Sequence, residues 1–301
     1  MAPALHRFSF FAMGSQCELQ LYAGDESAAS SAAQCAIDEV LRIEARYSRY
    51  RDDSILAKIN RAAAQGTSLP IDEETATLLD YAYACHAKSD GLFDITSGVL
   101  RRAWDFDASR LPEPRQLDAL LPLVGLHKIR WERPRLSFDL PGMELDFGGI
   151  AKEYAADQAA AVCVAQGIEH GLIELGGDIQ VIGPHPDLSP WIVGIRHPRL
   201  ADGIMTTVEI SRGAIASSGD YERYIVVDGV RYCHLLDPST GWPVQGLASV
   251  SVISEQCLVA GSVATMAMLK GNAGKQWLAA LGVPHLWMDE AGNSGGNIHP
   301  Q

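Results

Sequence analysis

Residues 172–196 read LIELGGDIQVIGPHPDLSPWIVGIR, and this stretch decides the fold class. It contains short apolar runs at 172–175, 179–182 and 191–196, which glycine, proline and aspartate separate. Short β-branched runs with such boundaries are typical of strands joined by turns. Similar runs follow at 204–210, 224–227, 232–236 and 250–253, and Asp228-Gly229 stands between two of them as a hairpin turn. We therefore predict largely antiparallel sheet in the second half of the chain.

Longer segments with the apolar spacing of helices occupy 27–46, 72–88, 151–166 and 257–270. The first follows a predicted strand at 16–23, and the last ends at Gly271. No internal repeat and no linker-like segment interrupts the chain. The pattern predicts an α+β fold in which several helices pack on antiparallel sheets. Residues 1–301 are expected to form one domain, either undivided or as two intimately packed lobes.

The charge balance restricts the ligands. With 37 acidic and 24 basic side chains the net charge is −13, so the field of the protein repels nucleic acid and anionic lipid. We therefore expect no nucleic-acid partner. A phosphate-bearing ligand would need a local positive group, such as a helix N-terminus, a lysine or a bound cation.

The cysteines and the apolar segments bear on location. Six cysteines lie at 17, 35, 85, 163, 233 and 257 without a CxxC spacing. We interpret them as buried thiols in a reducing compartment rather than as a zinc site or a disulfide framework. The N-terminus has no signal-peptide pattern, and no run of about 18 apolar residues occurs. We expect a cytoplasmic protein without a transmembrane segment.

The segment Asp146-Phe-Gly148-Gly149-Ile-Ala151-Lys152 is the first candidate for a ligand site. It is predicted to join a strand that ends near Leu145 to a helix that begins near Ala151. Two glycines let the backbone approach a ligand, and the helix N-terminus with Lys152 would supply positive charge for a phosphate. A purely structural turn is the alternative. The segment is neither a GxGxxG fingerprint nor a P-loop, which removes the main support for a dinucleotide fold or an NTPase.

Polar side chains gather in three later segments, namely 176–178, 217–221 and 234–241. His234 and Asp237 flank two apolar residues before a Pro-Ser-Thr-Gly turn, so the exit of a strand could present both at one sheet edge. A base and a metal-binding carboxylate could lie there. A turn histidine and an Asp that starts a β-turn are the alternative interpretation.

These segments, in this order, resemble the FAD:protein FMN transferases, or ApbE-like proteins, over roughly residues 9–282. The matching segments are Ala12-Met13-Gly14-Ser15, 48–54 with Asn60, 91–96, 146–152 with Tyr154 and Asp157, 176–178, 218–222, 234–241, and Ala264-Thr265.

The resemblance implies a reaction and assigns residues to it. FMN would pass from FAD to a threonine, or sometimes a serine, of an acceptor flavoprotein, with release of AMP and with Mg²⁺ as cofactor. It implies catalytic roles for His234 and Asp237, with His234 as base or orienting group, and Mg²⁺ ligands in the Gly149 carbonyl and Thr265. The implied FAD contacts are Met13, Tyr50, Leu92, Phe93, Asp94, Asp146, Lys152, Ser218 and Asp220.

The sequence departs from the family pattern at two positions. The last helix of the family usually carries an Asp ligand four residues before its Thr, where this chain has Gly261. Glu153 stands where the family usually has glycine, and its carboxylate could either replace the missing charge or obstruct the cleft. A weakened FAD-binding protein, acting as a flavin reservoir or chaperone, and an FAD pyrophosphatase are therefore the alternative functions.

Overall fold

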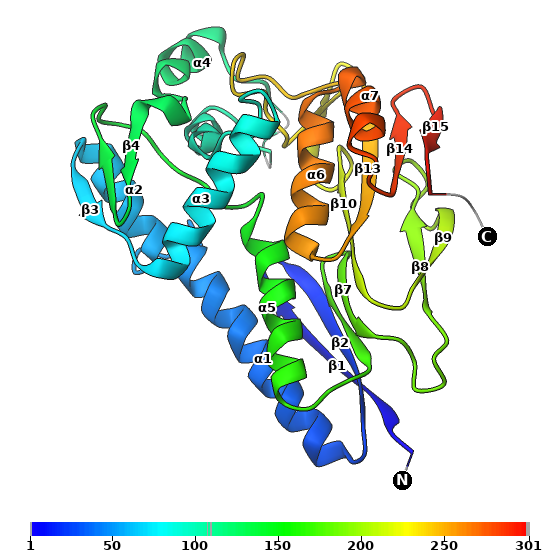
Figure 1. The fold of residues 1–301 in the computed structure, drawn as a ribbon. Coiled ribbons are helices and arrows are strands. Elements are labelled where there is room, and N and C mark those ends of the chain that lie inside the picture. The colour runs from blue at the N-terminus through cyan, green and yellow to red at the C-terminus, as the bar shows by residue number, and fades with distance from the viewer. Residues whose placement is uncertain (1, 107, 109, 299–301) are drawn as a thin grey trace.

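The computed structural model describes residues 2–106, 108 and 110–298, and an eight-stranded sheet is its centre (Figure 1). Neighbouring strands of this sheet are antiparallel throughout. In spatial order they are β1 (Ala4–Ala12), β2 (Ser15–Ala23), β6 (Gly171–Leu175), β7 (Asp178–Gly183), β10 (Gly213–Gly219), β13 (Leu247–Ser254), β14 (His285–Asp289) and β15 (Ser294–Gly296). The predicted α+β class with antiparallel sheets is confirmed.

The turn between β6 and β7 explains why the deciding stretch carries two glycines. Leu175 pairs with Asp178, so Gly176 and Gly177 alone form the turn. Their φ angles are 58° and 92°, and a two-residue hairpin with positive φ at both positions takes glycine without steric cost.

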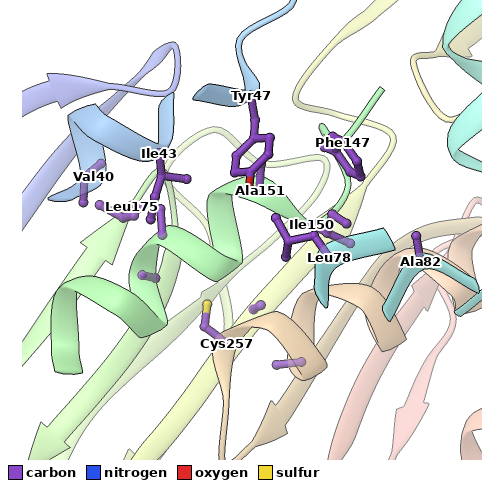
Figure 2. Packing of buried hydrophobic residues seen from close by; sticks show 14 of the residues in the cluster. Val40, Ile43, Tyr47, Leu78, Ala82, Phe147, Ile150, Ala151, Leu175 and Cys257 are labelled. Atoms are coloured by element: carbon purple, nitrogen blue, oxygen red, sulfur yellow. The ribbon is translucent and has the colours of Figure 1, made fainter. Parts of the chain in front are cut away.

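Three helices pack on one face of the sheet, namely α1 (Glu26–Tyr47), α5 (Ala151–Ala165) and α6 (Cys257–Leu269) (Figure 1). Asp25 caps α1 by accepting the N–H of Ala28 at 2.8 Å. Buried alanines on α1 and α5 allow the two helices to approach closely. Figure 2 shows part of this core, where Tyr47 and Phe147 meet edge to face with ring centroids 5.5 Å apart.

A hairpin of β8 (Trp191–Arg196) and β9 (Ile204–Ile210) covers the opposite face. Alternate residues of a strand point to opposite faces. Leu172 and Ile215 therefore pack with Trp191 of the hairpin, whereas Ile173 and Ala214 belong to the core under the helices.

The remaining elements lie beyond the helix layer and at the end of the sheet near the first turn of α5 (Figure 1). They are α2 (Ile55–Gln65), β3 (Ser68–Pro70), α3 (Glu73–Lys88), η1 (Ile95–Arg102), α4 (Pro114–Leu120), η2 (Leu121–Leu123), η3 (Leu126–Lys128), β4 (Ile129–Glu132), β5 (Arg135–Phe138), β11 (Tyr224–Val227) and β12 (Val230–Cys233). The last helix, α7 (Asn272–Leu281), instead lies beside α6 and contacts β14 (Figure 1).

Three local predictions were wrong. No strand ends near Leu145, because the side chain of Asn60 bonds both backbone groups of Leu145 and the Asp146 N–H donates to Ile95. The strand expected at 232–236 ends at Cys233, before the turn that contains His234. Cys35 is exposed, since it lies on the outer side of α1, while the other five thiols are buried.

Several elements of the structure were not predicted. They include the strands at 4–12 and 213–219 and the helices at 55–65 and 272–281. The signal for 55–65 is present in the sequence, since Leu56, Ile59, Ala62 and Ala63 have helical spacing between the N-cap Ser54 and the C-cap Gly66. The segment 213–219 shows no apolar–polar alternation and is stabilised by pairing with β7 and β13.

Candidate active site

A cavity of about 260 Å³ lies where the first turn of α5 meets β10, α6 and η1. It brings together nine of the residues singled out from the sequence, which are Leu92, Phe93, Asp94, Asp146, Gly149, Lys152, Ser218, His234 and Thr265. These residues come from segments far apart in the chain. The sequence motifs and the family resemblance therefore pointed to nine residues that only the fold brings to one cavity.

The turn that precedes α5 forms one wall of the cavity. The N–H of Gly148 donates to Oδ1 of Asp146 at 2.7 Å, which fixes the carboxylate against its own turn. Gly149 packs on the ring of Phe93, and a Cβ at this position would lie only 3.2 Å from the ring. Glycine at 149 therefore lets the backbone of the turn approach Phe93 closely.

Asp94 is buried and its oxygens are engaged by the protein. Oδ1 accepts the N–H and the hydroxyl of Thr96, at 2.8 and 2.6 Å, and Oδ2 accepts the N–H of Leu126 at 2.9 Å. These bonds cap η1 and connect it to η3. The contacts of Asp94 position the cavity wall.

Arginines supply the positive charge that the acidic chain otherwise lacks. A second cavity of about 250 Å³ shares Arg101 and His234 with the first, and Tyr50 and three more arginines line it. Arg49 and Arg101 each lie 3.3 Å from Oδ2 of Asp146. The guanidinium of Arg49 also lies over the ring of Tyr50, 4.7 Å from its centroid. Sequence reasoning missed this cluster, because the arginines that form it are scattered along the chain.

His234 connects the two cavities. Its Nδ1 lies 3.2 Å from the Arg223 carbonyl oxygen, which can only accept, so Nδ1 carries the proton and Nε2 keeps its lone pair. Burial, reinforced by the positive charges of Arg101, Arg223 and Lys152, lowers the pKa of His234 to about 4. The imidazole is therefore neutral at neutral pH and can accept a proton.

Lys152 forms an ion pair with Asp178, with Nζ 2.8 Å from Oδ2. Burial disfavours the ammonium, but the Asp178 and Glu153 carboxylates outweigh it and raise the pKa of Lys152. The lysine predicted to stand free for a phosphate is thus partly neutralised by Asp178, the first residue of β7.

Glu153 and Gly261 contact each other between α5 and α6. An ideal Cβ built at Gly261 would lie 2.5 Å from Cγ of Glu153 and 3.0 Å from its Oε1. Glu153 is 7% exposed and lines the cavity. Burial and the nearby Asp178 carboxylate raise the pKa of Glu153 above its ordinary value. One turn along α6 from Gly261, the hydroxyl of Thr265 donates to Ser218 Oγ at 3.3 Å.

Four of the sequence-predicted site residues lie outside the main cavity. Met13 donates its N–H to Glu44 at 2.8 Å, and Tyr50 lines the second cavity. Asp220 is buried in a bidentate pair with Arg199, at 2.6 and 2.7 Å.

Asp237 lines a different cavity from His234, and its Oδ1 accepts the N–H and the hydroxyl of Ser239. His234 and Asp237, which were expected from the sequence at one sheet edge, therefore line different cavities.

Among the residues that the structure describes, no group of three or more His, Cys, Asp or Glu side chains is arranged to hold a metal ion. Within the same residues, no helix combines the length and the apolar character needed to cross a bilayer.

Comparisons with known proteins agree with this geometry. The model of the ApbE family matches residues 13–287. The FAD:protein FMN transferase of Vibrio cholerae is 32% identical over 250 residues, which are 81% of this chain and 75% of the relative. The ApbE protein of Thermotoga maritima superposes with a TM-score of 0.90 at 30% identity, over 98% of this chain and 97% of that one. The apo flavinyl transferase ApbE of Pseudomonas stutzeri gives 0.86 at 29% identity, over 98% and 94%. This chain therefore belongs to the ApbE family.

Proposed function

We propose that this protein is an FAD:protein FMN transferase, which moves FMN from FAD to a threonine or serine hydroxyl of an acceptor flavoprotein and releases AMP. Family membership and the activity named for its relatives support the assignment. The observation that carries it is the neutral His234, whose Nε2 is free to accept a proton at the junction of two cavities bordered by arginines.

The two cavities would hold FAD between them. Tyr50 is 77% exposed, and its ring offers a flat face on which the flavin can stack. The arginines offer hydrogen-bond donors to the diphosphate, and an arginine fork suits phosphate geometry. We therefore propose the residues that line the cavities as the FAD contacts. Met13 and Asp220 would act indirectly, by fixing the β1–β2 turn and the segment after β10.

The transfer is a phosphoryl-type substitution. The acceptor hydroxyl oxygen forms a bond to the FMN phosphorus, and the bond from that phosphorus to the bridging oxygen breaks. The hydroxyl proton passes to Nε2 of His234, and AMP leaves with the bridging oxygen. A positioned base of this kind contributes about 10²–10⁴-fold to such a step. Asp237 would hold the turn that positions His234, through its bonds to Ser239.

We propose Mg²⁺ as the cofactor, and the residues of the cavity fit this ion. Mg²⁺ prefers oxygen ligands and retains several waters, so few protein ligands suffice. Gly149 and Thr265 line the cavity beside Glu153, whose Oε2 is buried and bonds no described residue. The Gly149 carbonyl and the Thr265 hydroxyl would hold the ion. Bound Mg²⁺ would neutralise charge that develops on the AMP leaving group.

Incubation of the full chain with FAD, Mg²⁺ and a panel of threonine-containing peptides tests the proposal. We expect a peptide mass increase equal to the FMN moiety, equimolar AMP, and no label on matched alanine peptides. Free FMN and AMP without label would instead indicate a pyrophosphatase. Bound, intact FAD without AMP would indicate a flavin reservoir.

The location of the protein and its division into lobes are proposed from the sequence. We propose a cytoplasmic location from the cysteine usage, and a single functional unit in which the FAD cleft lies between two packed lobes. Cell fractionation and limited proteolysis with and without FAD would test them.

A further inference from the structure

We infer that Glu153 is the carboxylate ligand of a divalent cation in the main cavity, supplied from α5 where position 261 of α6 has no side chain. The inference rests on the proposed function for the identity of the cation. It depends on the packing of α5 against α6 at Glu153 and Gly261, and on the buried Oε2 of Glu153, which bonds no described residue.

Glu153 differs from the other acidic residues that line the cavity. Asp94 accepts three hydrogen bonds, Asp146 pairs with Arg49 and Arg101, and Glu222 pairs with Arg196 at 3.2 Å. Oε2 of Glu153 is buried and bonds no described residue. An unpaired carboxylate is costly to bury unless a cation compensates it.

The nearby Lys152 interacts with both Asp178 and Glu153, so one ammonium group serves two carboxyl groups. Lys152 lies 2.8 Å from Asp178. One acidic group therefore remains at the cavity for a cation to match.

The carboxylate stands near the other proposed ligands. Glu153 is in the first turn of α5, four residues after Gly149 of the preceding turn, and Gly261 lies one turn before Thr265 along α6. A Cβ at Gly261 would lie only 2.5 Å from Cγ and 3.0 Å from Oε1 of Glu153, so the glutamate side chain leaves no room for a side chain at 261. The turn before α5, the first turn of α5 and α6 thus bring Gly149, a carboxylate and Thr265 to one cavity.

Binding of Mn²⁺ to the FAD-free full chain, followed by electron paramagnetic resonance, tests the inference without requiring activity. We expect Glu153→Gln, which preserves the side-chain shape, to weaken Mn²⁺ binding by about ten-fold or more, as loss of a direct carboxylate ligand should. The matched control Glu222→Gln removes the same charge from the cavity wall, and we expect it to change the affinity less than about two-fold. Equal affinities for the wild type and Glu153→Gln would overturn the inference.

A carboxylate exchange gives a second, independent measurement. Gly261→Asp alone should lower the melting temperature, because its side chain collides with Glu153. The double variant Glu153→Gly with Gly261→Asp moves the carboxylate to α6, and we expect Mn²⁺ binding to return. If the double variant folds but does not bind Mn²⁺, a carboxylate from position 261 does not replace the one from Glu153, which would count against the inference.

The results separate this inference from the proposed function. Mn²⁺ binding that depends on Glu153 without any FMN transfer would support the ligand and reject the transferase. FMN transfer by the wild type, together with unchanged Mn²⁺ binding in Glu153→Gln, would support the transferase and reject Glu153 as a ligand.

Discussion

Lys152 in the first turn of α5 and Asp178 at the start of β7 form an ion pair of 2.8 Å across the wall of the cavity. The carboxylate side chain is 2% exposed, whereas the lysine side chain is 28% exposed. Removal of the lysine therefore leaves a buried carboxylate, whereas removal of the aspartate leaves a partly exposed ammonium group. The pair also connects the helix that begins at the glycine turn to the central sheet.

We predict that Lys152→Met destabilises the protein more than Asp178→Asn does. Loss of the lysine leaves a buried carboxylate beside Glu153 without compensation, and such losses cost about 3–5 kcal/mol. Loss of the aspartate leaves a lysine that reaches water and Glu153. Urea unfolding monitored by circular dichroism would measure both. The exposed pair Arg7–Glu18 is the control, and its disruption should cost at most about 1 kcal/mol. Equal effects of the two variants would contradict the asymmetry.

We predict that His234→Gln lowers the rate of AMP release by about 10²–10⁴-fold while FAD binding changes only a few-fold. Glutamine preserves hydrogen bonding but cannot take up the hydroxyl proton. Single-turnover chromatography of AMP, together with fluorescence titration of FAD, separates the two effects. His127→Gln, at an exposed position outside both cavities, is the control. A His234→Gln variant with the wild-type rate would exclude the histidine as base.

We predict a pH signature of the same histidine in stability. Its pKa is lowered from 6.5 to about 4 in the folded protein, so between these values only the unfolded chain binds the proton. Folding stability supplied by this group is therefore complete above 6.5 and is lost as pH falls toward about 4. The wild type should lose more stability than His234→Gln between neutral pH and pH about 4.5. Parallel stability curves of the two proteins would show that His234 titrates normally.

We predict that Tyr50→Ala weakens FAD binding by roughly two- to ten-fold, which corresponds to about 0.5–1.5 kcal/mol of aromatic contact. Tyr50→Phe keeps the ring and should bind like the wild type. Neither variant should alter the melting temperature much, since the side chain is 77% exposed. Tyr224→Ala is a matched control, because Tyr224 also carries an arginine over its ring but lines neither cavity. Unchanged affinity in Tyr50→Ala would place the flavin elsewhere.

Two of the elements around the site, α5 and α6, could be predicted because their signals are local, whereas β10 and η1 were not predicted. The Ala-rich periodicity of 151–166 predicts α5, and the glycine pair at 176–177 predicts the β6–β7 turn. The approach to the glycine turn could not be predicted, since residues near Leu145 alternate like a strand but bond the side chain of Asn60. The residues near Leu145 do not themselves indicate that the Asn60 side chain, and not a neighbouring strand, bonds their backbone.

The α+β class, four of the helices, the family and nine residues of the main cavity could be predicted from the residue pattern, because these depend on periodicity, turn chemistry and motif order. Three features depend on packing between distant segments: Asp237 lines a different cavity from His234, arginines gather around Asp146, and Glu153 fills the space beside Gly261. The spacing of residues along the chain determines which residues share a face of a helix, whereas the packing of the helices and sheet determines which distant residues contact that face.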